Sequence, residues 1–157
     1  MVVKKILAAA MSALAVTAGL VVAGGSASAA APDCQTTTGY GVVVSSAPVK
    51  GLADGTAIGK IQLCRDAAYH YWAFVRFYSP LNASSWGDAY LYRYRDGVQV
   101  SKIDCGSGNG IVKPGETRCW TGTLDGMSGS YTFQAVGEVT SSHTGNVYAQ
   151  GWTPITR

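Results

Sequence analysis

The clearest structural signal in the chain is the run Leu91-Tyr92-Arg93-Tyr94-Arg95-Asp96-Gly97-Val98-Gln99-Val100. An Asp-Gly pair stands here between two segments in which residue types alternate. Asp-Gly is typical of a two-residue type I′ turn, because both central residues of that turn need a positive φ. The run therefore predicts a β-hairpin. Its predicted pairs are Arg95 with Val98, Tyr94 with Gln99, Arg93 with Val100 and Tyr92 with Ser101.

The alternation divides this hairpin into two faces. The first face carries three tyrosines: Tyr90, Tyr92 and Tyr94, with Gln99, Ser101 and Ile103. The second carries three cations: Arg93, Arg95 and Lys102, with Leu91, Val98 and Val100. Because unpaired charge is costly to bury, we expect the cationic face in solvent and the tyrosines in the core. The alternative is an exposed row of tyrosines that stacks on sugar rings or packs against a partner.

The rest of the chain after residue 30 repeats the hairpin's pattern. Short alternating, β-branched and aromatic runs are separated by Gly, Pro, Asn, Asp and Ser, and no helical period lasts for three turns. The predicted strands are 41–46, 57–64, 69–78, 89–95, 98–104, 117–123, 130–140 and 146–153. About eight short strands at this spacing predict an all-β protein, an antiparallel β-sandwich or open barrel, with a single domain over residues 30–157.

The strand at 69–78 is apolar on both faces, which predicts a central strand covered on both sides. His70 and Arg76 share one of its faces, so we expect that face to reach solvent at its ends.

Four cysteines follow the N-terminal segment: Cys34, Cys64, Cys105 and Cys119. An even number in an exported chain predicts two disulfides, and neighbouring segments favour Cys34–Cys64 and Cys105–Cys119. No C-x-x-C pair is present, so a metal site is not expected. The Gly-rich segment 106–118 is interpreted as a stapled connection between strands.

The first 29 residues have the features of a signal peptide. Lys4 and Lys5 precede an apolar stretch at 6–23, and Ala27-Ser28-Ala29 fits the cleavage rule. A membrane anchor is the alternative, since the apolar stretch approaches the length that spans a bilayer. We expect cleavage after residue 29 and a secreted, extracellular product with no membrane attachment.

Composition argues against several classes of function. Only 13% of the residues are charged, and 12 Lys and Arg against 9 Asp and Glu form no basic run, so nucleic acid is not an expected partner. The chain has no Gly-x-Ser-x-Gly elbow and no His-Glu-x-x-His helix. Its histidines are His70 and His143, and the latter is expected in an exposed turn. The carboxylates considered for a glycosidase pair are Asp66, Asp88, Glu116 and Glu138.

Aromatic excess without a convincing catalytic set (4 Trp, 9 Tyr and 3 Phe) favours binding over catalysis. The expected function is non-enzymatic binding of a cell-wall or extracellular glycan or a protein partner, without a cofactor. The candidate stacking residues are Trp86, Tyr90, Tyr92 and Tyr94, and the candidate hydrogen-bond donors are Arg93 and Arg76. Three alternatives stay open: a protease inhibitor that uses the 105–119 disulfide loop, a small hydrolase that pairs a histidine with a carboxylate, and a structural envelope protein. The oligomeric state is also open.

Overall fold

The computed structural model describes residues 33–127 and 130–157, so the predicted signal peptide, residues 1–29, lies outside the described residues. Nine strands and one short 3-10 helix follow in order: β1 (Val42–Gly51), β2 (Ala57–Arg65), β3 (His70–Phe77), β4 (Trp86–Arg95), β5 (Val98–Asp104), η1 (Cys105–Ser107), β6 (Arg118–Trp120), β7 (Leu124–Asp125), β8 (Tyr131–Thr140) and β9 (Val147–Trp152). All eight predicted strands are present: β5 has the predicted ends, the other seven have shifted ends, and β7 is additional.

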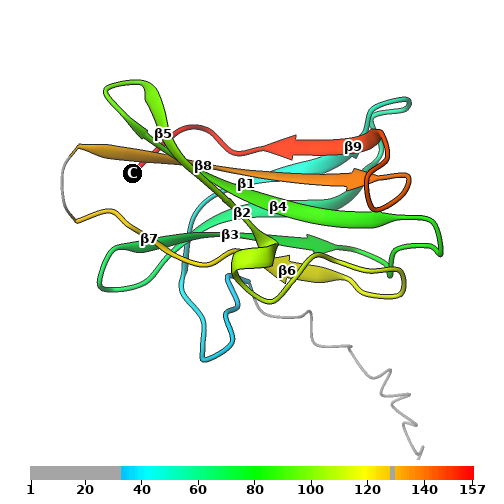
Figure 1. Ribbon diagram of the computed structural model, residues 1–157, viewed down its shortest axis with the longest axis horizontal. Helices are drawn as coiled ribbons and strands as arrows, with labels where there is room; N and C mark the ends of the chain where they lie inside the picture. Colours follow the sequence, from blue (N-terminus) through cyan, green and yellow to red (C-terminus); the bar gives the residue numbers. More distant parts are fainter. Residues whose placement is uncertain (1–32, 128–129) are drawn as a thin grey trace, which may run out of the picture. The chain divides into compact units, whose positions relative to one another are not determined.

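The strands form one antiparallel sheet in the order β5-β4-β8-β9-β1-β2-β3-β6, with β7 paired to β3. The sheet curls into a half-barrel, and β3 contacts both β4 and β8 across its interior (Figure 1). The prediction of an all-β antiparallel sandwich or open barrel is therefore confirmed. Within the described residues, no helix is long and apolar enough to cross a bilayer.

The interior of the curl holds the hydrophobic core. Tyr71 of β3 and Phe133 of β8 stack at its centre, with ring centroids 4.1 Å apart and planes 10° apart. Both side chains are fully buried. Further core residues come from most strands and from one connection: Val49, Ile61, Leu63, Ala73, Val75, Ala89, Leu91, Val112, Ala135, Val139 and Ala149.

The β4–β5 hairpin has the predicted turn but only part of the predicted register. Asp96 and Gly97 have φ of 51° and 78°, as a type I′ turn requires. Arg95 pairs with Val98 and Tyr94 with Gln99, as predicted, whereas the pairs expected for Arg93 and Tyr92 are wrong. A β-bulge shifts the register by one residue, so the observed pairs are Arg93 with Ser101 and Tyr92 with Lys102. Since side chains alternate with period two, the bulge exchanges the faces of β5 beyond it.

The expectation that the tyrosines of this hairpin fill the core is wrong. Ala89 and Leu91 are fully buried and belong to the core, and they alternate with the tyrosines on β4. The cations do not prevent this burial, because Arg93 and Arg95 stand at the turn end of β4, where each guanidinium lies over the ring of Tyr131.

The bulge also explains the directions in which Lys102 and Ile103 of β5 point. Lys102 faces the tyrosines, with its ammonium 3.8 Å from the ring centroid of Tyr90. Ile103 instead packs against the core.

Both predicted disulfides are confirmed, with Cα–Cα distances of 5.5 Å for Cys34–Cys64 and 6.0 Å for Cys105–Cys119. The first packs with Trp72 and Phe74 in a second buried cluster on the outer face of β3. The expectation that both faces of the 69–78 segment are covered is therefore confirmed. His70 and Arg76, at the two ends of β3, are only half-buried.

Candidate functional site

The outer face of β4 carries four aromatic side chains that we call the aromatic row: Trp86, Tyr90, Tyr92 and Tyr94. All four are half-buried and lie at alternate positions of the strand, with Asp88 between Trp86 and Tyr90. The ring centroids of Tyr90 and Tyr92 lie 6.4 Å apart, and those of Tyr92 and Tyr94 are separated by the same distance. The three tyrosine rings are therefore regularly spaced along one strand and partly accessible to solvent.

The neighbouring strands hold these rings in place. The Tyr94 hydroxyl donates to Gln134 Oε1 at 3.0 Å, and Gln134 Nε2 donates to the carbonyl of Thr153 at 2.9 Å. Val136 pairs with Tyr90 on one side and with Trp152 on the other, and only 1% of its surface is exposed. Side chains fixed in this way lose little conformational entropy when they bind a ligand, which favours affinity.

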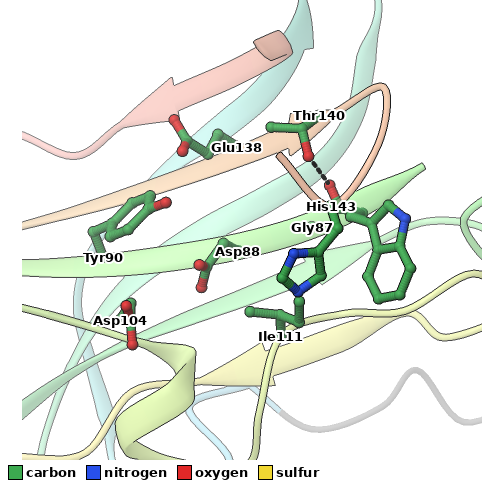
Figure 2. A pocket seen from close by; sticks show the side chains of 9 residues that line it. Gly87, Asp88, Tyr90, Asp104, Ile111, Glu138, Thr140 and His143 are labelled. Carbon is green, nitrogen blue, oxygen red and sulfur yellow. Dashed lines mark hydrogen bonds between the residues drawn. The ribbon is translucent and has the colours of Figure 1, made fainter. Parts of the chain in front are cut away.

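A pocket of about 230 Å³ lies at the Trp86 end of the aromatic row (Figure 2). Its lining comes from β4, the end of β5, the connection after η1, β8 and the turn after β8. The lining residues are Trp86, Gly87, Asp88, Tyr90, Asp104, Ile111, Glu138, Thr140 and His143. The His143 ring meets the Trp86 ring edge to face, at 5.0 Å between centroids and 80° between planes. The pocket is therefore both aromatic and polar.

Three carboxylates, those of Asp88, Asp104 and Glu138, line this pocket. Asp88 on β4 and Glu138 on β8 are direct partners across the two strands. Burial raises the pKa of Asp88 to about 6, and the charges of Asp104 and Glu138 add to the rise, although backbone N–H groups oppose it. Burial also raises the pKa of Tyr90, and the interaction with the Glu138 carboxylate adds to the rise.

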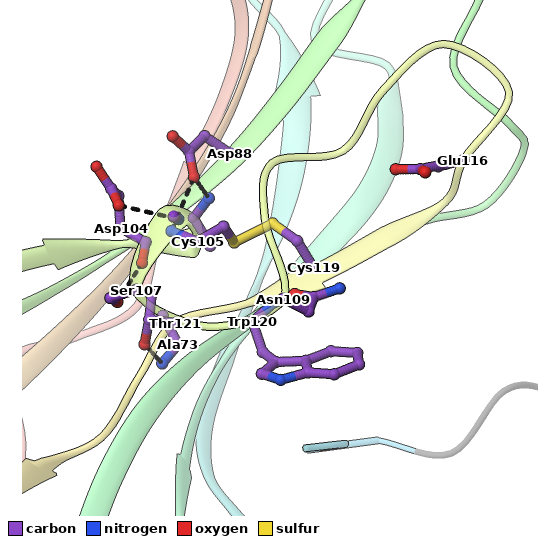
Figure 3. The surroundings of a disulfide bond; sticks show 12 residues. Ala73, Asp88, Asp104, Cys105, Ser107, Asn109, Glu116, Cys119, Trp120 and Thr121 are labelled. Atoms are coloured by element: carbon purple, nitrogen blue, oxygen red, sulfur yellow. Dashed lines mark hydrogen bonds between the residues drawn. A yellow bond between two sulfur atoms is a disulfide. The ribbon is translucent and has the colours of Figure 1, made fainter. Parts of the chain in front are cut away.

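The Cys105–Cys119 disulfide fixes the position of Asp88 (Figure 3). Asp88 Oδ1 accepts the backbone N–H of Ala89 at 2.8 Å and that of Cys105 at 3.1 Å. The carboxylate and the two sulfur atoms lie within 4.8 Å of one another. Because both sulfurs are consumed by the disulfide, they cannot act as thiolate ligands, and this group does not form a metal site.

The chain between the two bonded cysteines lies against the same part of the fold. Val112 and Gly87 exchange two backbone hydrogen bonds of 2.8 and 2.9 Å, and Val112 is fully buried. The 105–119 connection is thus anchored to β4 below the pocket.

The structure brings together some of the predicted site residues and separates others. Trp86, Tyr90, Tyr92 and Tyr94 share the outer face of β4. Arg93 faces the other side, where it donates to the carbonyl of Asp125 at 3.3 Å.

Arg76 lies on β3, between Lys60 of β2 and Arg118 of β6, and is therefore not part of the aromatic row. His143 is exposed in the turn after β8, as expected. His70 contacts Asp66, with Nδ1 and Oδ2 2.8 Å apart, and lines no part of the pocket.

Sequence reasoning considered Asp88 and Glu138 one by one but did not place them beside the aromatic row. The missed signal is the alternation Trp86-x-Asp88-x-Tyr90. Because the predicted strand began at residue 89, Trp86 and Asp88 were not assigned to the face that Tyr90 occupies. With β4 starting at Trp86, period-two alternation puts all three on one face.

No protein-family model, curated protein or solved structure matches the chain.

Proposed function

We propose that the protein binds a cell-wall or extracellular glycan along the aromatic row and in the adjoining pocket. The observation that carries this proposal is the set of half-exposed rings of Trp86, Tyr90, Tyr92 and Tyr94 on one strand face. Sugar rings present apolar C–H faces that stack on aromatic rings, and their hydroxyl groups need polar partners. Tyrosine supplies an apolar ring and a hydroxyl in one side chain.

The polar partners lie at the ends and edges of the row. Asp104 and Glu138 offer carboxylate oxygens as acceptors for sugar hydroxyls, and Gln134 and Gln150 stand on the neighbouring strands. An elongated row that ends in a pocket suits a chain of sugar units better than a single small molecule.

An extracellular location agrees with this function. The described residues contain two disulfides and no free cysteine. Disulfides persist in oxidising compartments, where wall and matrix polysaccharides occur. The signal-peptide pattern at residues 1–29 supports the same location.

The proposal is tested with soluble xylan, β-1,3-glucan, β-1,4-glucan, chitin oligosaccharides and purified peptidoglycan, by affinity electrophoresis and calorimetry. We expect at least one of these to bind, and Tyr92→Ala to weaken its binding about tenfold, equivalent to roughly 1.4 kcal/mol. Tyr40→Ala is the matched control, because Tyr40 is 64% exposed and lies outside the row. Absence of binding across the panel, or equal losses in both variants, would contradict the proposal.

A further inference from the structure

We infer that the pocket hydrolyses the glycan that the aromatic row binds, with Asp88 as general acid and base and Glu138 as nucleophile. This inference rests on the proposed function and goes beyond binding. The sequence indicated no convincing catalytic set. The fold, however, puts two of its carboxylates on directly paired residues that line one aromatic pocket.

The spacing of the pair follows from sheet geometry. Asp88 and Glu138 are directly opposed on adjacent antiparallel strands and line the same pocket. Directly opposed residues on one face have Cβ atoms about 4.5–5.5 Å apart. Retaining glycosidases hold their two carboxyl groups about 5–5.5 Å apart, whereas inverting enzymes leave about 6.5–9.5 Å for a water molecule. A Cβ separation of this size lets rotation about the side-chain bonds bring the two carboxyl groups to the shorter distance, so we assign the retaining mechanism to the pair.

The two carboxyl groups have different surroundings, as their two roles require. Asp88 Oδ1 is occupied by the backbone N–H groups of Ala89 and Cys105, so Oδ2 is the oxygen that can carry a proton. Burial and the nearby charges of Asp104 and Glu138 raise the pKa of Asp88 to about 6, which keeps a protonated fraction near neutral pH.

Glu138 is positioned by a residue of the neighbouring strand β9. Gln150 Nε2 donates to Glu138 Oε2 at 3.2 Å, and Tyr90 lines the pocket near the same carboxylate. Figure 2 shows Tyr90 and Glu138 on the same side of Asp88, with His143 on the other. A carboxylate held in this way is oriented before the substrate arrives, as nucleophilic catalysis requires.

The aromatic row directs the substrate over the pair. Trp86 and Tyr90 lie two residues before and two residues after Asp88, on the same face of β4. Sugar units stacked on these two rings place the bond between them above Asp88 and Glu138. Tyr92 and Tyr94 extend the row for further units, so the expected substrate is a polysaccharide or a long oligosaccharide.

The reaction balances with water as its co-reactant. First, Asp88 donates the Oδ2 proton to the glycosidic oxygen as the bond from C1 to that oxygen breaks, and Glu138 forms an ester bond to C1. Next, a water molecule gives its proton to Asp88 while its oxygen attacks C1, and the ester bond breaks with its electron pair returning to Glu138. One glycoside and one water become two sugars, with no net oxidation.

Hydrolysis is tested by reducing-end release from the five glycans of the binding panel. We expect activity in the full secreted protein and a loss of 10³-fold or more in both Asp88→Asn and Glu138→Gln. Glu116→Gln is the matched control, because the Glu116 carboxylate is exposed and lines no part of the pocket. Thermal unfolding checks that each variant is folded. Proton NMR of the first product is expected to show retention of the anomeric configuration.

Binding and hydrolysis are separated by measuring affinity with Glu138→Gln, which cannot consume its ligand. Binding without reducing-end release from any glycan would overturn the inference and leave the proposed function standing. Activity that persists in both carboxylate variants would also overturn it. Absence of binding together with absence of hydrolysis would overturn both.

Discussion

β3 and β4 are both rich in aromatic residues, yet the fold uses them in opposite ways. On β3, Tyr71, Trp72, Phe74 and Phe77 are at most 3% exposed. On β4, the four side chains of the aromatic row are all half-buried and reach solvent. Aromatic composition therefore does not distinguish a buried strand from a half-exposed one in this protein.

The difference lies in what covers each outer face. Trp72 and Phe74 lie beneath the Cys34–Cys64 disulfide and against Trp120, which together form a second buried cluster. On the outer face of β4, Lys102 of β5 lies over the Tyr90 ring and the pocket adjoins Trp86, so the four side chains of the aromatic row stay half-exposed. Aromatic residues on an uncovered strand face stay accessible to solvent, whereas the same residues under a covalent cross-link become part of the interior.

The largest expected effect is the difference in stability between two variants, each of which shortens one tyrosine, on β3 or on β4. Tyr71→Ala removes a fully buried ring that stacks on Phe133, so we expect it to lower the free energy of unfolding by about 3–5 kcal/mol. Tyr92→Ala removes a half-exposed ring and is expected to cost less than about 1 kcal/mol. Urea unfolding followed by fluorescence measures both.

Tyr71→Phe refines this test. The buried Tyr71 hydroxyl has no hydrogen-bond partner among the described residues, so its removal is expected to leave stability unchanged or slightly higher. Equal losses of unfolding free energy for Tyr71→Ala and Tyr92→Ala would contradict the conclusion that β3 is covered on its outer face and β4 is not.

A second prediction concerns the Cys34–Cys64 disulfide, which covers the outer face of β3. Replacing Cys34 and Cys64 together by alanine opens a loop with a sequence separation of 30 residues. We expect a loss of about 3–4 kcal/mol, mainly because the unfolded chain regains freedom. Removal of Cys34–Cys64 is also expected to expose Trp72, seen as a red shift of tryptophan emission in the folded variant. An unchanged spectrum and unchanged stability would show that β3 stays buried without its cross-link.

The smallest expected effect concerns the pH dependence of stability through Asp88 on β4. The folded-state pKa of about 6 lies above the ordinary value of 3.8, so the folded protein holds more protons between these values. Stability should therefore fall as pH rises from about 4 to about 6 and then level off. The groups around Asp88 in the pocket are Tyr90, Asp104, Glu138 and His143.

Asp88→Asn keeps an acceptor for the two backbone N–H groups and removes the titration. We expect the variant to be more stable than the wild type at pH 7 by about 1–2 kcal/mol, after allowance for solvent screening at this incompletely buried site. Melting temperatures at pH 4 to 8 provide the measurement, with Glu116→Gln, at an exposed carboxylate outside the pocket, as the control. The same pH slope in the wild type and in Asp88→Asn would contradict the assignment.

Local signals predicted what depends on neighbours along the chain. Asp96-Gly97 predicted the turn, and alternation predicted that the three tyrosines share a face. The spacing of the four cysteines predicted both disulfides. The bulge in β5 was not predictable in this way, because Gln99, Val100 and Ser101 alternate without interruption. Its consequence, Lys102 over Tyr90 and Ile103 against the core, also escaped prediction.

The sequence by itself determined the all-β architecture, the hairpin turn and the residues that share each face of β4, and it favoured the observed cysteine pairs, because these follow from period-two alternation and short-range chain geometry. Only the tertiary structure decided that Leu91 faces inward and Tyr92 outward, and that Asp88 meets Glu138. Alternation shows which side chains lie together on a strand but not which side the sheet curls around. That choice depends on contacts such as Tyr71 with Phe133, between strands far apart in the chain.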